Sequence, residues 1–254
     1  MSNFKVPTEW IDLPSKGLVY PAGNPLKEGK LELRYPGARQ DDILTNINYA
    51  KQGILMDVYF KSLIVTPINY DDLLLGDQDM IMVAARILGD GSEYIFDYTP
   101  DGEDKPVVVK KNLQELQDKP IHPLLKDGVM EYPFELPVSK LVVTVKLLTH
   151  KDEVAIDKEL KGWQKLKNDD DRKISTRLKH TIVAINGNRS QAEINDFIDS
   201  GALIKKDLIP LRQFISDITP GIDFKFDYTR ADGEVVEGLS MPITMDFFWP
   251  KSRS

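Results

Sequence analysis

The segment 71–99, DDLLLGDQDMIMVAARILGDGSEYIFDYT, decides the fold, because a helix pattern in it runs directly into a strand pattern. Asp77 is expected to cap the start of the helix, and Gly89 to close its end in a left-handed conformation. The apolar face of the helix, at positions i, i+4, i+7 and i+8, consists of Met80, Ala84, Ile87 and Leu88. Nothing in the segment indicates catalysis, so we predict that it forms a docking core.

Two β-hairpins are predicted, one following this helix and one near the end of the chain. Tyr94, Phe96 and Tyr98 alternate with other residues as in a strand, which an acidic turn joins to a returning valine-rich strand. The sequence Phe-Asp-Tyr-Thr followed by Asp-Gly-Glu occurs within residues 96–103 and again within 226–234. Either two hairpins share the same favourable turn residues, or a helix-plus-hairpin unit is duplicated. We favour the duplication.

The first residues of the chain are predicted to form an extended arm. Pro7, Pro14, Pro21 and Pro25 fix extended backbone, and glycines between them allow turns. Such an arm can wrap its own domain or reach a neighbouring subunit. Its apolar anchors are Trp10, Leu13, Leu18, Val19 and Tyr20.

The whole chain is predicted to be an α+β protein in which helix-plus-hairpin units surround a helical middle. Residues 1–29 form the proline-rich extended arm, 30–148 the first α+β unit, and 149–254 a helical region followed by the C-terminal hairpin unit. One helix of the middle is expected at 174–185. Its apolar face is marked by Ile174, Leu178, Ile182 and Ile185.

The composition excludes several classes of function. At 254 residues, the chain can hold one large domain or two modest ones. Its net charge of −7 and sequence pI of about 5.1 disfavour nucleic-acid binding, which needs a concentrated positive surface. No apolar run is long enough for a membrane span, no secretory signal pattern opens the chain, and no cysteine is present. The charged segment 158–179 is predicted to be a solvated surface, with a charged partner surface as the alternative.

The sequence contains no pattern that carries chemistry. His122, His150 and His180 lack the spacing of a zinc-binding helix, and Asp169–Asp171 lacks the spaced ligands and turn glycine of a calcium loop. No nucleophile elbow, phosphate loop or dinucleotide fingerprint occurs. We therefore expect no catalytic, cofactor-binding or metal-binding residue and no small-molecule substrate. The alternative is a hydrolase whose carboxylates come together from distant positions.

Several segments together resemble the baseplate hub and baseplate hub assembly family of contractile-tailed, T-even-type bacteriophages. They occur in the order found in that family and span nearly the whole chain. The segments are LPSKGLVYP (13–21), LLLGDQDMIMVAARILGDGSEY (73–94), FELPVSKLVVTVKLLTHKDE (134–153), RLKHTIVAINGN (177–188) and MPITMDFFWP (241–250). The helix block at 73–94 and the terminal Phe-Phe-Trp-Pro are the more specific matches.

One departure from the family concerns a metal. Related sequences often carry cysteine pairs after the two hairpin strands, which suggests hairpins stapled by zinc. Here the corresponding positions are Asp97-Tyr98-Thr99 and Asp227-Tyr228-Thr229. No metal site is therefore carried over, and packing of phenylalanine and tyrosine is expected to hold the hairpins.

The resemblance implies a non-enzymatic protein of the phage tail baseplate that binds other baseplate or tail proteins, with self-association as a further option. It acts either as a component of the virion tail or as a transient assembly chaperone in the host cytoplasm. The residues expected to bind partners are Trp10, Leu13, Tyr20, Phe247, Phe248 and Trp249. Burial in the chain's own core is the alternative for one or two of the terminal aromatics.

Overall fold

The computed structural model describes residues 5–101, 103, 105–165, 172–230 and 232–248. It has the α+β composition that the sequence predicts. The α-helices of the described residues are α1 (Ala38–Leu44), α2 (Ile47–Gln52), α3 (Leu55–Leu63), α4 (Leu75–Asp90), α5 (His150–Lys165), α6 (Lys173–Thr181), α7 (Gln191–Asp199) and α8 (Lys205–Ile218).

All the strands pair antiparallel, in small separate sheets. In the part of the chain that the structure describes, three sheets are two-stranded and one has three strands in the order β5-β6-β7. The strands are β1 (Thr8–Asp12) with β2 (Lys30–Arg34), β3 (Glu93–Tyr98) with β4 (Val107–Asn112), β5 (Glu131–Glu135) with β6 (Val142–Lys146) and β7 (Ile182–Ile185), and β8 (Lys225–Thr229) with β9 (Val235–Ser240).

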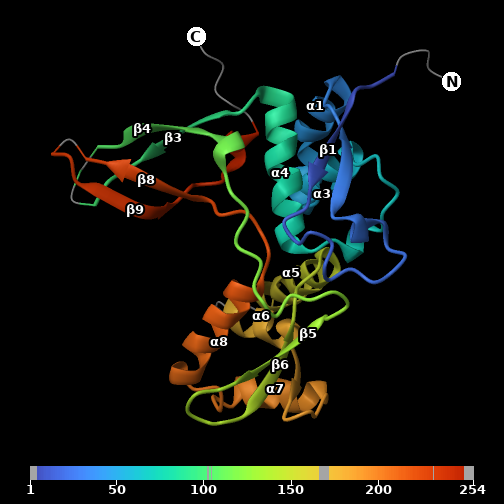
Figure 1. Cartoon of the computed structure of the whole chain (residues 1–254), viewed down its shortest axis with the longest axis vertical. Coiled ribbons are helices and arrows are strands. Elements are labelled where there is room, and N and C mark those ends of the chain that lie inside the picture. Colours follow the sequence, from blue (N-terminus) through green and yellow to red (C-terminus); the bar gives the residue numbers. More distant parts are fainter. Residues whose placement is uncertain (1–4, 102, 104, 166–171, 231, 249–254) are drawn as a thin grey trace.

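The elements are arranged in three parts (Figure 1). Helices α1, α3 and α4 lie with strand β1 in the first part. The hairpins β3–β4 and β8–β9 lie side by side and project from the end of α4. Helices α5 to α8 and the three-stranded sheet form the third part, which lies beyond the start of α4.

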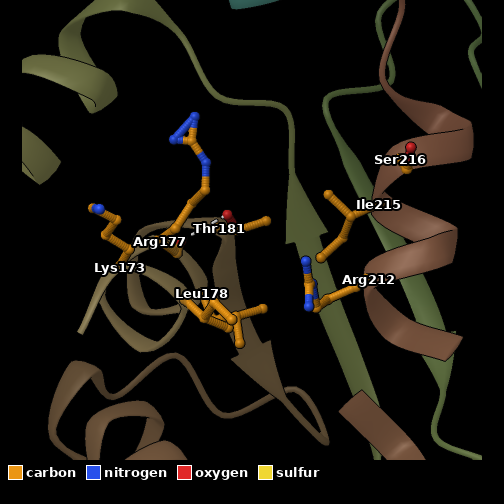
Figure 2. Close-up of a pocket in the computed structure, with 8 residues that line it drawn as sticks. Lys173, Arg177, Leu178, Thr181, Arg212, Ile215 and Ser216 are labelled. Atoms are coloured by element: carbon orange, nitrogen blue, oxygen red, sulfur yellow. Dashed lines mark hydrogen bonds between the residues drawn. The ribbon is translucent and has the colours of Figure 1, made fainter. Parts of the chain in front are cut away.

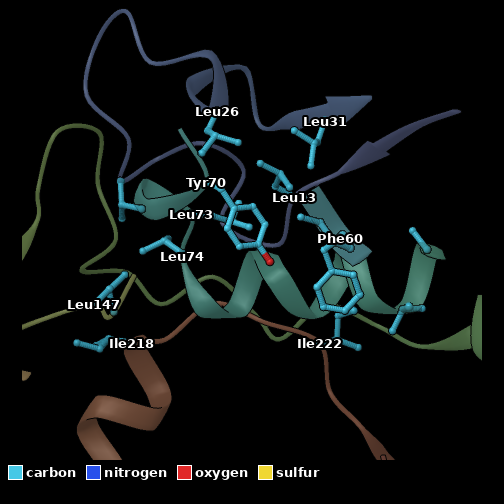
Figure 3. Close-up of a cluster of buried hydrophobic side chains, with 14 of the residues drawn as sticks. Leu13, Leu26, Leu31, Phe60, Tyr70, Leu73, Leu74, Leu147, Ile218 and Ile222 are labelled. Carbon is cyan, nitrogen blue, oxygen red and sulfur yellow. The ribbon is translucent and has the colours of Figure 1, made fainter. Parts of the chain in front are cut away.

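The predicted arm is part of the first sheet and of the core. Strand β1 pairs with β2 from Thr8 opposite Arg34 to Asp12 opposite Lys30. Residues 13–20, called the arm loop here, then pack against the first turn of α4, and Leu13 is fully buried there. Figure 3 shows Leu13 and Leu26 in the same apolar cluster as Phe60 and Leu73. Of the two predicted placements, the described part of the arm therefore has the one in which it wraps its own domain.

Strand β7 corrects the helix predicted at 174–185. Helix α6 ends at Thr181, and residues Ile182–Ile185 pair with β6 instead. The apolar residues of this stretch fit a helical spacing, but β-branched side chains also suit a buried strand, and the free edge of β6 decides between the two. The sheet of β5, β6 and β7 therefore contains strands from both sides of the boundary predicted between residues 148 and 149.

The two hairpins are held together by their repeated aromatic residues. The ring of Phe226 meets those of Phe96 and Tyr98 edge-on, at centroid distances of 5.1 and 5.5 Å, and Tyr98 meets Tyr228 at 5.4 Å. Edge-on ring pairs of this kind stabilise beyond the area that they bury. The two copies of Phe-Asp-Tyr-Thr thus pack against each other.

Helix α8 is anchored by a buried carboxylate in its first turn. Asp207 is fully buried, and its carboxylate accepts hydrogen bonds from the backbone N–H groups of Val138 (2.7 Å) and Ser139 (3.1 Å). Burial raises the pKa of Asp207, but the backbone hydrogen bonds, together with the Ser139 side chain and the positive charge of Lys140, bring the pKa below its ordinary value. The turn between β5 and β6 is thereby fixed to α8.

The start of α4 and the end of α8 meet in backbone contact. A Cβ placed on Gly76 would lie 1.8 Å from the carbonyl oxygen of Pro220. Beside this contact, the N–H of Lys119 donates to the carbonyl of Gly221 at 2.8 Å. Only glycine allows α4 to approach this closely.

We predict that Gly76→Ala destabilises the protein by about 3 kcal/mol, because the added methyl group forces α4 and α8 apart. The control is Gly162→Ala within α5, where an added Cβ meets nothing within 4 Å. This control is expected to stabilise by ~0.5–1 kcal/mol through its higher helix propensity. Urea denaturation of both variants measures the difference, and equal stabilities would contradict the contact.

Candidate docking surface

A buried carboxylate ties the arm loop to helix α4. Asp77 accepts hydrogen bonds from the N–H and the hydroxyl of Ser15, at 2.9 and 2.7 Å, and from the hydroxyl of Tyr20 at 2.6 Å. The Tyr20 oxygen in turn accepts the N–H of Leu74 at 3.0 Å. This network satisfies the polar groups of both segments at the place where water is excluded.

This arrangement corrects two predicted helix ends. Helix α4 begins at Leu75, so Asp77 lies in its first turn and bonds the arm loop rather than acting as the N-cap. At the other end the helix continues to Asp90, and the residue that caps it is Gly91 rather than Gly89; Gly91 has a positive φ of 86°, but its ψ of 174° is not that of the left-handed helical conformation. The sequence located the helix but not the partner of its buried acid.

Two acids near the start of α4 have raised pKa values. Burial raises the pKa of Asp77, and the hydrogen bonds from Tyr20 and Ser15 only partly oppose this. Burial also raises the pKa of Asp79 to about 6, although the positive charge of Lys119 acts in the opposite direction. The start of α4 is therefore sensitive to protonation.

Four of the six residues predicted to bind partners lie in the core. Leu13 and Tyr20 are buried beneath α4, and Phe247 and Phe248 are 0% and 7% exposed. The Phe248 ring packs against Tyr59 and Phe60 of α3, and Phe247 packs against Tyr94 of β3. These four side chains hold the domain together and are not available to a partner. Trp249 lies outside the described residues.

Trp10 differs from the other predicted residues because it is 59% exposed. It lies in the middle of β1, on the face opposite Ile11, which packs against the core. The sequence does not distinguish Trp10 from the buried apolar residues of the arm, because cores and interfaces use the same residue types.

Strand β1 also has a free edge. Its only strand partner in the described residues is β2. The Tyr35 N–H donates to the carbonyl of Pro7, and the Leu13 N–H donates to the carbonyl of Gly29. Because hydrogen-bonded pairs alternate along an antiparallel ladder, the odd-numbered residues of β1 bond to β2. The backbone groups of Thr8, Trp10 and Asp12 therefore point away from β2. An exposed tryptophan thus lies beside backbone donors and acceptors that no strand uses within the described part of the chain.

A second surface feature is a groove between α6 and α8, called the α6–α8 groove here (Figure 2). It encloses about 260 Å³ and is lined by Lys173, Ile174, Arg177, Leu178, Thr181, Arg212, Ile215 and Ser216. The sequence does not predict this groove, because α6 and α8 are separated in the chain and the helical spacing places Ile174 on an apolar face. The charge of segment 158–179 was the available signal.

Comparison with known proteins gives no match: no protein-family model, no curated protein and no solved structure is similar to this chain. Within the described residues, no helix has both the length and the apolar character of a membrane span. The same residues contain no cluster of histidine and acidic side chains suited to a metal ion.

We predict that Asp77→Ala destabilises the protein by about 3 kcal/mol, because three donors lose their acceptor in a buried place. Asp72→Ala is the matched control, since Asp72 is an exposed aspartate close by in the chain; its effect is expected to stay within about 0.5 kcal/mol. Chemical denaturation checks both values. An equally small loss for the two variants would show that the network does not hold the arm.

The raised pKa of Asp79 predicts a pH-dependent effect of Asp79→Asn. A carboxyl whose pKa rises on folding favours the folded state while it is protonated, and this contribution is lost as the pH rises through about 6. The variant is therefore expected to be about 1–3 kcal/mol more stable than the native protein at pH 8, with a much smaller difference at pH 4. Denaturation at both pH values tests this, and a pH-independent difference would contradict it.

Proposed function

We propose that this chain is a non-enzymatic protein of a bacteriophage tail baseplate that binds other baseplate subunits. It serves as a structural component or as an assembly factor. The resemblance of five segments to the baseplate hub and hub assembly family supports the phage context. The exposed edge of β1 supports the binding role.

The observation that carries the binding role is the exposed side chain of Trp10 on β1, a strand whose second edge has no strand partner among the described residues. Tryptophan is enriched among the residues that dominate binding energy at protein interfaces. A partner that covers the indole of Trp10 would remove a large apolar surface from water. A segment added to the free edge of β1 would use the outward N–H and C=O groups of this strand and cover the indole at the same time. The free edge of β1 would therefore give the partner segment both binding energy and a defined pairing register.

Mass spectrometry of purified virions and infected-cell lysate tests the phage context. A few copies per particle, in a fixed ratio to other tail proteins, would identify a structural subunit. Abundance in the lysate with none in the particles would identify the transient chaperone. Presence in neither, or in cells without phage or prophage, would reject the proposal.

We predict that Trp10→Ala reduces the amount of baseplate protein recovered with the tagged chain from infected cells by at least tenfold, because the partner loses its main anchor. Ile47→Ala is the control, since Ile47 is 68% exposed and belongs to α2 rather than to the sheet of β1 and β2. Both variants are expected to keep their thermal stability. Undiminished recovery with Trp10→Ala would remove β1 as the docking strand.

A further inference from the structure

The α6–α8 groove has an apolar interior. Ile174 and Leu178 come from α6, and Ile215 reaches across from α8 (Figure 2). Ile174 is 50% exposed, although it lies on a helix whose other face is buried. The volume of about 260 Å³ is below the range of pockets that hold cofactors or drug-sized ligands, so it suits one or two side chains of a protein.

Among the described residues, the charged side chains that line the groove are all basic. Lys173 and Arg177 come from α6 and Arg212 from α8, in a chain whose net charge is −7. The guanidinium of Arg177 donates hydrogen bonds to the Glu153 carboxylate at 2.7 and 2.8 Å, which offsets the charge of Arg177. Arg212 is exposed and has no ion pair with another described residue. Figure 2 shows its side chain directed toward α6.

We propose that the α6–α8 groove binds an acidic, amphipathic segment of a partner protein. Apolar side chains of that segment fill the space between Ile174, Leu178 and Ile215, and a flanking carboxylate pairs with Arg212. Arginine suits this role because its planar group binds a carboxylate through two parallel hydrogen bonds. The charge of the rim selects an acidic partner over a basic one.

A nucleic acid would also meet a basic rim, but it fits the groove less well. Its phosphates and sugars would leave the apolar interior formed by Ile174, Leu178 and Ile215 without a partner. The groove is distinct from the β1 edge and lies in the third part of the molecule. The inference therefore holds or fails independently of the proposed baseplate function.

Fluorescence anisotropy of the whole chain with two labelled peptide sets tests the proposal. One set has leucine or phenylalanine at positions i, i+3 and i+4 of a 12-residue peptide, with glutamate elsewhere; the other has lysine in place of every glutamate. The acidic set is expected to bind, and to bind more weakly as salt is raised. The basic set is expected not to bind. Failure of the acidic set, or equal binding of both sets, would overturn the proposal.

Variants assign the binding to the groove. Arg212→Glu and Ile174→Gln each change an exposed residue and are expected to weaken binding of the acidic peptides at least tenfold. Lys158→Glu makes the same charge change as Arg212→Glu on an exposed position of α5, and is expected to change affinity less than twofold. Circular dichroism confirms that each variant is folded. Equal losses in Arg212→Glu and Lys158→Glu would reduce the effect to overall charge and overturn the proposal.

A labelled single-stranded DNA of about 20 nucleotides serves as the competing ligand. It is expected to bind no more tightly to the native protein than to Arg212→Glu. Binding of the DNA that exceeds that of the acidic peptides, and that is lost in Arg212→Glu, would assign the groove to nucleic acid and overturn the proposal.

Discussion

A carboxylate that cannot reach water sets the conditions for the rest of the structure. Asp77 satisfies its hydrogen bonds only if Ser15 and Tyr20 lie against the first turn of α4. The third part of the molecule repeats the device. Asp207 occupies the same third position of α8 and holds a loop that, like the arm loop, begins with Leu-Pro, the leucine of which is buried. Each loop also contains a lysine with positive φ, 52° for Lys16 and 60° for Lys140. Loops of similar sequence are thus fixed by buried acids in similar places.

The sequence predicts what local periodicity controls. Helix α4 and strand β3 follow from their spacing, and the α+β class follows from the alternation of such segments. Strand β7 was predicted as helix because Ile182 and Ile185 continue the spacing of α6, and only the edge of β6, far away in the chain, decides otherwise. Tertiary pairing also joins regions that the predicted boundaries separate.

The docking residues show a different limit. Hydrophobicity marks Phe247 and Trp10 as anchors but does not say whether the anchor meets its own chain or another. The structure distinguishes them by exposure alone: Phe247 is sealed against Tyr94, whereas Trp10 is open to solvent. The α6–α8 groove was beyond sequence reasoning because its two walls come from separate helices. In the hairpins, aromatic ring contacts join strands in a chain that has no cysteine for a metal to bind.

The contact between Gly76 and Pro220 has a consequence for how the chain folds. Helix α4 cannot reach its final packing until a segment more than a hundred residues later has been made, and Tyr94 likewise waits for its hydrogen-bond acceptor, the carbonyl of Pro242. Contacts of such sequence separation slow folding and leave apolar surface uncovered during synthesis. On the ribosome, the start of α4 and the Tyr94 hydroxyl of β3 therefore remain without these partners until the last part of the chain has been made.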